Sequence, residues 1–118
     1  MYLSVVDRVD PSQLAKANLL GGSITFDVNL SQSGCGCITS IYGVVMPAIQ
    51  SKTDPFGYCD AAQTSGYPCP EFDIMEANRY AFSSTAHSCN EPMGGVFYQC
   101  DRAGGCSSNV LLSGKEYQ

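Results

Sequence analysis

The sequence lacks the features that mark several large classes of protein. Its 118 residues include no tryptophan, one histidine, and 6 Lys and Arg against 11 Asp and Glu. The resulting net charge of −5 argues against nucleic acid as a partner. No apolar run approaches the ~18 residues of a membrane span, so we expect no transmembrane segment. Cys35-Gly36-Cys37 and His87-Ser88-Cys89 have no second Cys-x-x-Cys or histidine pair beside them, so we expect no metal site and no cofactor.

The composition is that of a folded domain from an oxidising environment. Hydrophobic residues make up 44% of the chain and charged residues 14%, which excludes a disordered tail. Seven cysteines indicate an extracellular, secretory or organelle-lumen location, and their odd number leaves at least one free or paired outside the chain. Residues 1–6 are too short and lack the basic flank of a signal peptide. We therefore expect that a leader has been removed or that the chain starts inside a longer protein.

The pattern along the chain favours β-strands. A helix start of one or two turns is indicated at residues 10–13, with Asp at the N-cap and Pro at the first position. The clearest strand is residues 23–30, where apolar and polar side chains alternate. After Asn78 we expect loops to about residue 108. Other strands are predicted at residues 2–6, 38–46 (with Ile41, Val44 and Val45 in the core) and 109–112. This pattern predicts an all-β antiparallel sandwich.

The stretch from Glu71 to Asn78 organises the rest of the chain. It places three carboxylates, at Glu71, Asp73 and Glu76, within six residues and separates them with apolar side chains. In a strand, Glu71 and Asp73 would share one face and Phe72 and Ile74 would point into the core. Strict alternation would bury Glu76 on the Phe72 face, so we predict a β-bulge that returns Glu76 to the acidic face. Paired carboxyl groups on one face suit glycoside hydrolysis. A solvated acidic face is the alternative interpretation of the spacing.

The residues around the acids resemble a known family. Cys69-Pro70-Glu71-Phe72-Asp73-Ile74-Met75-Glu76-Ala77-Asn78, followed by His87-Ser88-Cys89, is similar to the signature of glycoside hydrolase family 7. That family comprises cellobiohydrolases and endoglucanases with a curved β-jelly roll and a cleft on its concave sheet. The resemblance covers nearly the whole chain but only the middle of the family's catalytic domain. It therefore implies that residues 1–118 are one truncated domain of this type, with long disulfide-linked loops.

The resemblance also implies roles for individual residues. Glu71 matches the nucleophile, Asp73 the supporting acid and Glu76 the acid/base of a retaining β-1,4-glucan hydrolase. The family's substrate-binding residues are matched by Tyr42, Tyr58, Asp60 and His87. The alternatives are ordinary packing or turn formation for Tyr58 and Asp60, and a loop histidine bonded to backbone for His87.

The resemblance extends to the cysteines. Cys59 and Cys69 match two cysteines that form a disulfide in the family, and Cys89 and Cys100 match another such pair. Cys35 and Cys106 match cysteines whose partners lie in family segments absent here, and Cys37 has no counterpart.

Three functions remain open from the sequence. The first is a segment of a retaining cellulase acting on β-1,4-glucan. The second is a non-catalytic, hydrolase-derived structural subunit of a larger assembly, supported by the truncation, the missing tryptophan and the unpaired cysteines. The third is a carbohydrate-binding module. In each case we expect further protein, from the same polypeptide or another subunit, to cover open sheet edges.

Overall fold

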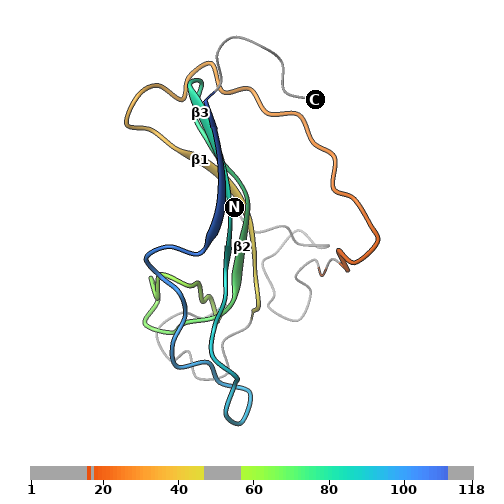
Figure 1. Cartoon of the computed structure of the whole chain (residues 1–118), viewed down its shortest axis with the longest axis vertical. Helices are drawn as coiled ribbons and strands as arrows, with labels where there is room; N and C mark the ends of the chain where they lie inside the picture. Colours follow the sequence, from red (N-terminus) through yellow and green to blue (C-terminus); the bar gives the residue numbers. More distant parts are fainter. Residues whose placement is uncertain (1–15, 17, 47–56, 112–118) are drawn as a thin grey trace.

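One four-stranded antiparallel sheet dominates the molecule (Figure 1). The computed structural model describes residue 16, residues 18–46 and residues 57–111. Within these ranges there is no helix, and hence none long and apolar enough to cross a membrane. The strands follow the order β1-β2-β3-β4, with bounds β1 Thr39–Val44, β2 Glu71–Ala77, β3 Ala81–His87 and β4 Cys106–Leu111. The predicted all-β antiparallel fold is confirmed, and the carboxylate stretch is a central strand.

The predicted bulge in β2 is confirmed. Tyr42 of β1 opposes Asp73, whereas the adjacent Ile41 opposes Met75, so Ile74 is an extra residue on β2. On the other side the register also shifts by one residue between Asp73 and Glu76. Side chains directly opposed in an antiparallel pair share a face. The extra residue therefore brings Glu76 to the face of Asp73.

Strand β3 was not predicted, because its sequence lacks large alternating apolar residues. It follows a tight turn in which the Asn78 side-chain oxygen accepts hydrogen bonds from the backbone N–H groups of Tyr80, at 2.9 Å, and Ala81, at 3.1 Å. Such an Asx turn reverses the chain and joins β2 to β3 as a hairpin. The prediction of loops from residue 79 to 108 is therefore wrong for residues 81–87 and 106–108, whereas residues 88–105 contain no strand or helix. Strand β4 begins at Cys106, three residues before the predicted start, because its first residues also lack large apolar side chains.

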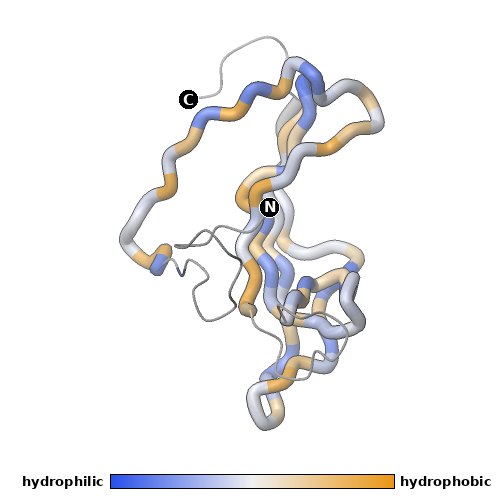
Figure 2. Tube along the Cα trace, turned by 180° about the vertical axis from the view of Figure 1, so that it is seen from behind, coloured by the Kyte–Doolittle hydropathy of each residue, from blue (hydrophilic) through white to orange (hydrophobic). Residues whose placement is uncertain are grey.

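The prediction of a strand at residues 23–30 is also wrong. This segment pairs with no strand that the structure describes, and it passes beside the sheet (Figure 2). Its apolar side chains are exposed: Ile24 by 48%, Phe26 by 39% and Val28 by 36%. Alternation specifies which side chains share a face, but a strand also needs a hydrogen-bonding neighbour. The strand predicted at residues 38–46 is confirmed over Thr39–Val44. The predictions for residues 2–6 and 10–13 lie outside the described residues.

The two faces of the sheet differ from the prediction in their burial. Met75 and Ala77 are buried, but Phe72 is 43% exposed. Phe72 opposes Gly43 on β1 and Ala86 on β3, which are too small to cover an aromatic ring. The expectation that Phe72 lies in a core is therefore wrong. Val45, also expected in the core, is 56% exposed just beyond the end of β1.

Two disulfides close the loops at one end of the sheet. Cys59 is bonded to Cys69 and Cys89 to Cys100, as the resemblance implied. The cysteines that are free and exposed in the structure are Cys35, Cys37 and Cys106. Disulfides form and persist in oxidising environments, which supports the predicted compartment.

Candidate active site

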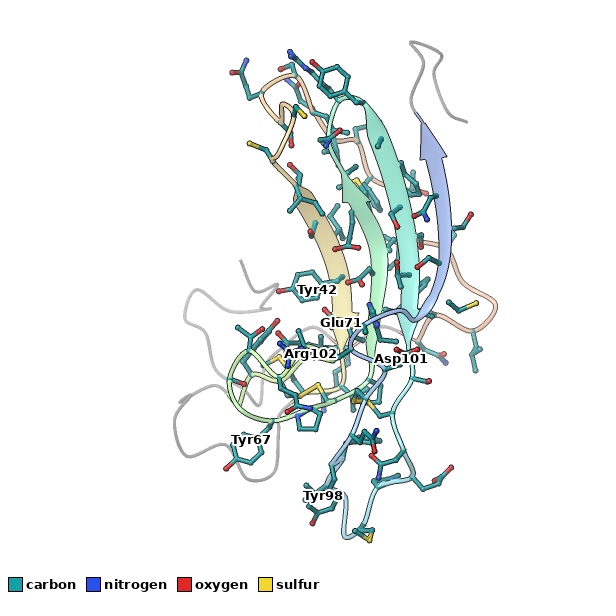
Figure 3. All side chains as sticks on the ribbon, turned by 60° about the vertical axis from the view of Figure 1, so that its left-hand side comes forward. Tyr42, Tyr67, Glu71, Tyr98, Asp101 and Arg102 are labelled. Carbon is teal, nitrogen blue, oxygen red and sulfur yellow. A yellow bond between two sulfur atoms is a disulfide. The ribbon has the colours of Figure 1, made fainter. Side chains whose placement is uncertain are left out.

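The predicted carboxylates lie on one face of the sheet, in three successive rows of opposed residues. The register gives the rows as Val44–Glu71–His87, Tyr42–Asp73–Thr85 and Ser40–Glu76–Ser83. Because of the bulge, all three acids lie on this face. Figure 3 shows Tyr42 and Glu71 on neighbouring strands near the loop that carries Asp101. The structure therefore brings Glu71, Asp73, Glu76, His87 and Tyr42 together on a single face.

Glu71 is half-buried at the start of β2 and is held by a loop amide. The backbone N–H of Ala61 donates a hydrogen bond to Glu71 Oε2 at 2.9 Å. Burial raises the pKa of Glu71 above its usual value of 4.5, the Ala61 bond opposes this, and the nearby charges of Asp73 and Asp60 raise it further. A bond from an N–H group stabilises the ionised form of a carboxyl group. Ala61 is thus a contact of the candidate site that could not be predicted from the sequence, because it is made by a backbone N–H.

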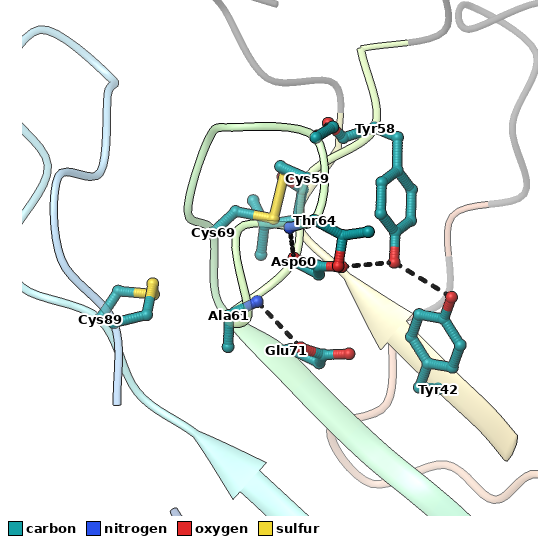
Figure 4. Close-up of a disulfide and its surroundings, with 12 residues drawn as sticks. Tyr42, Tyr58, Cys59, Asp60, Ala61, Thr64, Cys69, Glu71 and Cys89 are labelled. Carbon is teal, nitrogen blue, oxygen red and sulfur yellow. Dashed lines mark hydrogen bonds between the residues drawn. A yellow bond between two sulfur atoms is a disulfide. The ribbon is translucent and has the colours of Figure 1, made fainter. Parts of the chain in front are cut away.

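The loop that presents Ala61 is closed by the Cys59–Cys69 disulfide, and several of its polar groups are paired (Figure 4). Asp60 is 5% exposed and accepts hydrogen bonds from the Tyr58 hydroxyl at 3.0 Å and the Thr64 N–H at 2.8 Å. The Tyr58 hydroxyl also lies 3.1 Å from that of Tyr42. Burial and these two partners raise the pKa of Tyr58 well above its usual value. Tyr58 and Asp60 therefore link the loop to β1, and Asp60 also forms the expected turn.

Asp73 and His87 form a close pair in the middle of the site. His87 Nε2 lies 3.1 Å from Asp73 Oδ2, and both side chains are largely buried. The other ring nitrogen, Nδ1, lies 2.6 Å from the backbone carbonyl oxygen of Asp101. His87 therefore makes the backbone contact of the alternative interpretation, but it also contacts the central acid. Asp101 is a second residue that sequence reasoning missed.

Glu76 lies at the far end of the acidic face from the loop. Burial raises the pKa of Glu76 above its usual value, and the neighbouring charge of Asp73 raises it further. Its opposed residues, Ser40 and Ser83, are small and polar. A carboxyl group whose pKa is raised stays protonated to higher pH and is suited to donate a proton.

Hydroxyl groups continue the polar face across β3 and β4. Thr85 Oγ1 lies 3.1 Å from Ser107 Oγ and 3.4 Å from Ser83 Oγ. Thr85 is buried, whereas Ser107 is exposed. The residues that the structure describes include no group of three or more His, Cys, Asp and Glu side chains arranged to hold a metal ion. The site therefore offers carboxyl, imidazole and hydroxyl groups for chemistry.

Comparison with known proteins points to endoglucanases. The chain is 36% identical over 138 aligned residues to endoglucanase EG-1 of Hypocrea jecorina, covering 96% of this chain and 28% of the relative. It is 31% identical over 131 residues to endo-beta-1,4-glucanase celB of Aspergillus oryzae, covering 93% of this chain and 30% of the relative. Endoglucanase 1 of Humicola insolens is 30% identical over 117 residues, covering 78% of this chain. The chain spans less than a third of the length of these relatives. No protein-family model and no solved structure matches it.

Proposed function

We propose that this chain belongs to glycoside hydrolase family 7 and carries the catalytic strand of a retaining β-1,4-glucan hydrolase. The observation that supports the proposal most is the bulge in β2, which gathers Glu71, Asp73 and Glu76 on one face. A strand with a merely solvated acidic face has no need of an extra residue at that point. Similarity to endoglucanases over most of the chain supports the same substrate class.

In this proposal the two glutamates have different roles. Glu71 attacks the anomeric carbon as the glycosidic C–O bond breaks, and Glu76 gives its proton to the leaving oxygen. Water then attacks the glycosyl–Glu71 ester, Glu76 takes a proton from that water, and Glu71 is released as a carboxylate. Burial raises the pKa of both glutamates, which favours the protonated form that the acid Glu76 needs. At Glu71 the Ala61 N–H opposes that rise and so favours the ionised form that a nucleophile needs.

The remaining residues have supporting roles in the proposal. Asp73 lies between the two glutamates, close to both, and is held by His87. Tyr42 and the Tyr58–Asp60 pair form the wall beside Glu71 and present hydroxyl groups to sugar. The four strands would form one layer of the family's sandwich, with the acidic face lining the substrate cleft.

The test is the stereochemistry of hydrolysis of a soluble β-1,4-glucan oligosaccharide, followed by proton NMR. A retaining enzyme releases the β-anomer first. The wild-type chain is expected to do so, and Glu71→Gln is expected to lose hydrolysis while keeping oligosaccharide affinity. Asp27→Asn, which changes an exposed carboxylate outside the site, is the matched control. Initial release of the α-anomer would contradict the assignment of Glu71 as the nucleophile.

A second candidate is the hydrolase-derived structural subunit. Its support is the exposure of Phe72, by 43%, on the side of the sheet away from the acids and of Val45, by 56%, just beyond the end of β1. Such surface is typical of a protein that binds another. Binding of oligosaccharide by both wild type and Glu71→Gln without turnover would instead favour a carbohydrate-binding module. If the wild type shows neither oligosaccharide binding nor turnover, the result would favour the structural subunit.

A further inference from the structure

The ring of His87 faces a hydrogen-bond acceptor at each of its nitrogens. Nδ1 lies 2.6 Å from the carbonyl oxygen of Asp101, and a backbone carbonyl can only accept. Nδ1 must therefore carry a hydrogen. The neutral ring then has its lone pair on Nε2, which lies 3.1 Å from a carboxylate oxygen of Asp73. Two lone pairs at this distance repel, so the contact requires a proton between Nε2 and Oδ2.

The turn that supplies this carbonyl is itself fixed at several points. The Asp101 carboxylate accepts hydrogen bonds from the N–H groups of Gly104 at 3.2 Å and Gly105 at 2.9 Å. The Asp101 N–H donates to the carbonyl of Ser88 at 2.8 Å, next to the Cys89–Cys100 disulfide. The carbonyl of Asp101 is thus held in place by its own side chain and by its own N–H.

Gly105 shows that this turn fits closely around the histidine. A Cβ at residue 105 would lie 3.0 Å from His87 Nδ1, 2.7 Å from Thr85 Cγ2 and 2.8 Å from the carbonyl oxygen of Ala86. Its φ of +65° is also one that residues with a side chain rarely adopt. Residue 105 must therefore be glycine for the turn to approach the ring.

We propose that Asp101 and Gly105 are positioning residues, which hold His87 in the form protonated at Nδ1 and so keep one proton between His87 and Asp73. The charged groups around the ring are the carboxylates of Asp73, Glu71 and Glu76, and the carboxylate of Asp101 is turned toward the glycine amides. With a shared proton, the Asp73–His87 pair is neutral overall. Asp73 would then orient the two glutamates without opposing the ionisation of Glu71 as strongly as a bare carboxylate does.

The chain has one histidine, which makes the test direct. Two-bond proton–nitrogen NMR correlation on ¹⁵N-histidine-labelled protein distinguishes a protonated from an unprotonated ring nitrogen. In the wild type we expect Nδ1 to carry a hydrogen throughout the range from about pH 5 to 8. Asp101→Ala should release the turn and let the ring exchange between the form protonated at Nδ1 and the form protonated at Nε2. Asp101→Asn, which keeps one acceptor, should fall between the two.

Controls separate a positioning role from a general loss of structure. Asp27→Ala removes an exposed carboxylate outside the turn and should leave the histidine spectrum unchanged. Gly105→Ala should displace the ring as Asp101→Ala does. If Gly105→Ala does not fold, Asp101→Ala alone still decides the matter. A wild-type ring unprotonated at Nδ1 near pH 7, or a spectrum unaltered by Asp101→Ala, would overturn the proposal.

The catalytic consequence rests on the proposed function and is measured separately. In a hydrolysing enzyme, Asp101→Ala is expected to lower kcat by up to about 100-fold with little change in KM, because the central acid is displaced. Asp101→Asn should have a kcat between those of the wild type and Asp101→Ala. Absence of hydrolysis in the wild type, with the NMR result as expected, would reject the proposed function and leave the positioning role intact.

Discussion

The two disulfides offer a matched pair of perturbations whose effects on stability and on the site should differ. Cys59–Cys69 spans 10 residues and Cys89–Cys100 spans 11. In the chain-entropy model, closing loops of this size stabilises the folded state by about 2.7 kcal/mol each at 25 °C. Replacing either pair by alanine should therefore lower the free energy of unfolding by a similar entropic amount, which corresponds to roughly 10–20 °C in Tm.

Removal of the Cys59–Cys69 disulfide should lower the free energy of unfolding by more than this entropic amount. Cys59 and Cys69 are 0% and 2% exposed, whereas Cys100 is 9% exposed and Cys89 is only half-buried. The first loop also presents the Ala61 N–H to Glu71, a bond whose net contribution is about 1 kcal/mol. We expect Cys59→Ala/Cys69→Ala to be about 1 kcal/mol less stable than Cys89→Ala/Cys100→Ala.

Urea unfolding measures the free energies, and hydrogen exchange reports on the site. The free cysteines at 35, 37 and 106 should be alkylated first to prevent disulfide exchange. The Ala61 amide should be protected in the wild type and in Cys89→Ala/Cys100→Ala, but should exchange rapidly in Cys59→Ala/Cys69→Ala. A loss below about 1 kcal/mol for the first pair, or an Ala61 amide that remains protected, would refute the view that this disulfide holds the loop against Glu71.

Three further predictions follow from burial and charge. Burial and neighbouring charge raise the folded-state pKa of Glu71 and Glu76 above the usual value of 4.5. The stability that these groups contribute is therefore fully present below pH 4.5 and is lost as the pH rises through the folded-state pKa. Glu71→Gln and Glu76→Gln should thus raise Tm at about pH 7 and leave it nearly unchanged at about pH 4; a lower Tm at neutral pH would contradict the sign. Tyr58→Phe should cost about 1–2 kcal/mol in urea unfolding, because buried Asp60 loses a donor, whereas Tyr42→Phe at an exposed hydroxyl should cost less than half as much; equal losses would refute this ranking. Met75→Ala should cost about 2–4 kcal/mol and Phe72→Ala less than about 1 kcal/mol, because Met75 is 4% and Phe72 43% exposed, and the reverse order would mean that Phe72 is covered in solution.

The sequence predicted the centre of the site better than its surroundings. Glu71, Asp73 and Glu76 are out of phase for a regular strand, and an unpaired charge is costly in a core, so the bulge followed from those two facts. The disulfide pairs required the family resemblance, because spacing alone does not determine connectivity.

The parts that sequence did not reveal depend on backbone contacts between distant segments. Ala61 contacts Glu71 through its N–H, and Asp101 contacts His87 through its carbonyl, and neither contact needs a particular side chain to make it. Strand β3 was missed because Ser84, on the face away from the acids, interrupts the apolar pattern that Phe82 and Ala86 begin and end. Residues 23–30 have the alternation but no described neighbour to pair with, which is a property of the whole fold and not of the segment.

The assignment of Glu71 as the nucleophile can be tested most directly by trapping the glycosyl ester. The chain is incubated with a 2-deoxy-2-fluoro-cellobioside that carries an activated aryl leaving group, and the labelled peptide is identified by mass spectrometry. The slow hydrolysis of such esters lets the intermediate accumulate. We expect a single label on Glu71 in the wild type and in Asp27→Asn, and none in Glu71→Gln. A label on Asp73 or Glu76, or one that persists in Glu71→Gln, would contradict the assignment.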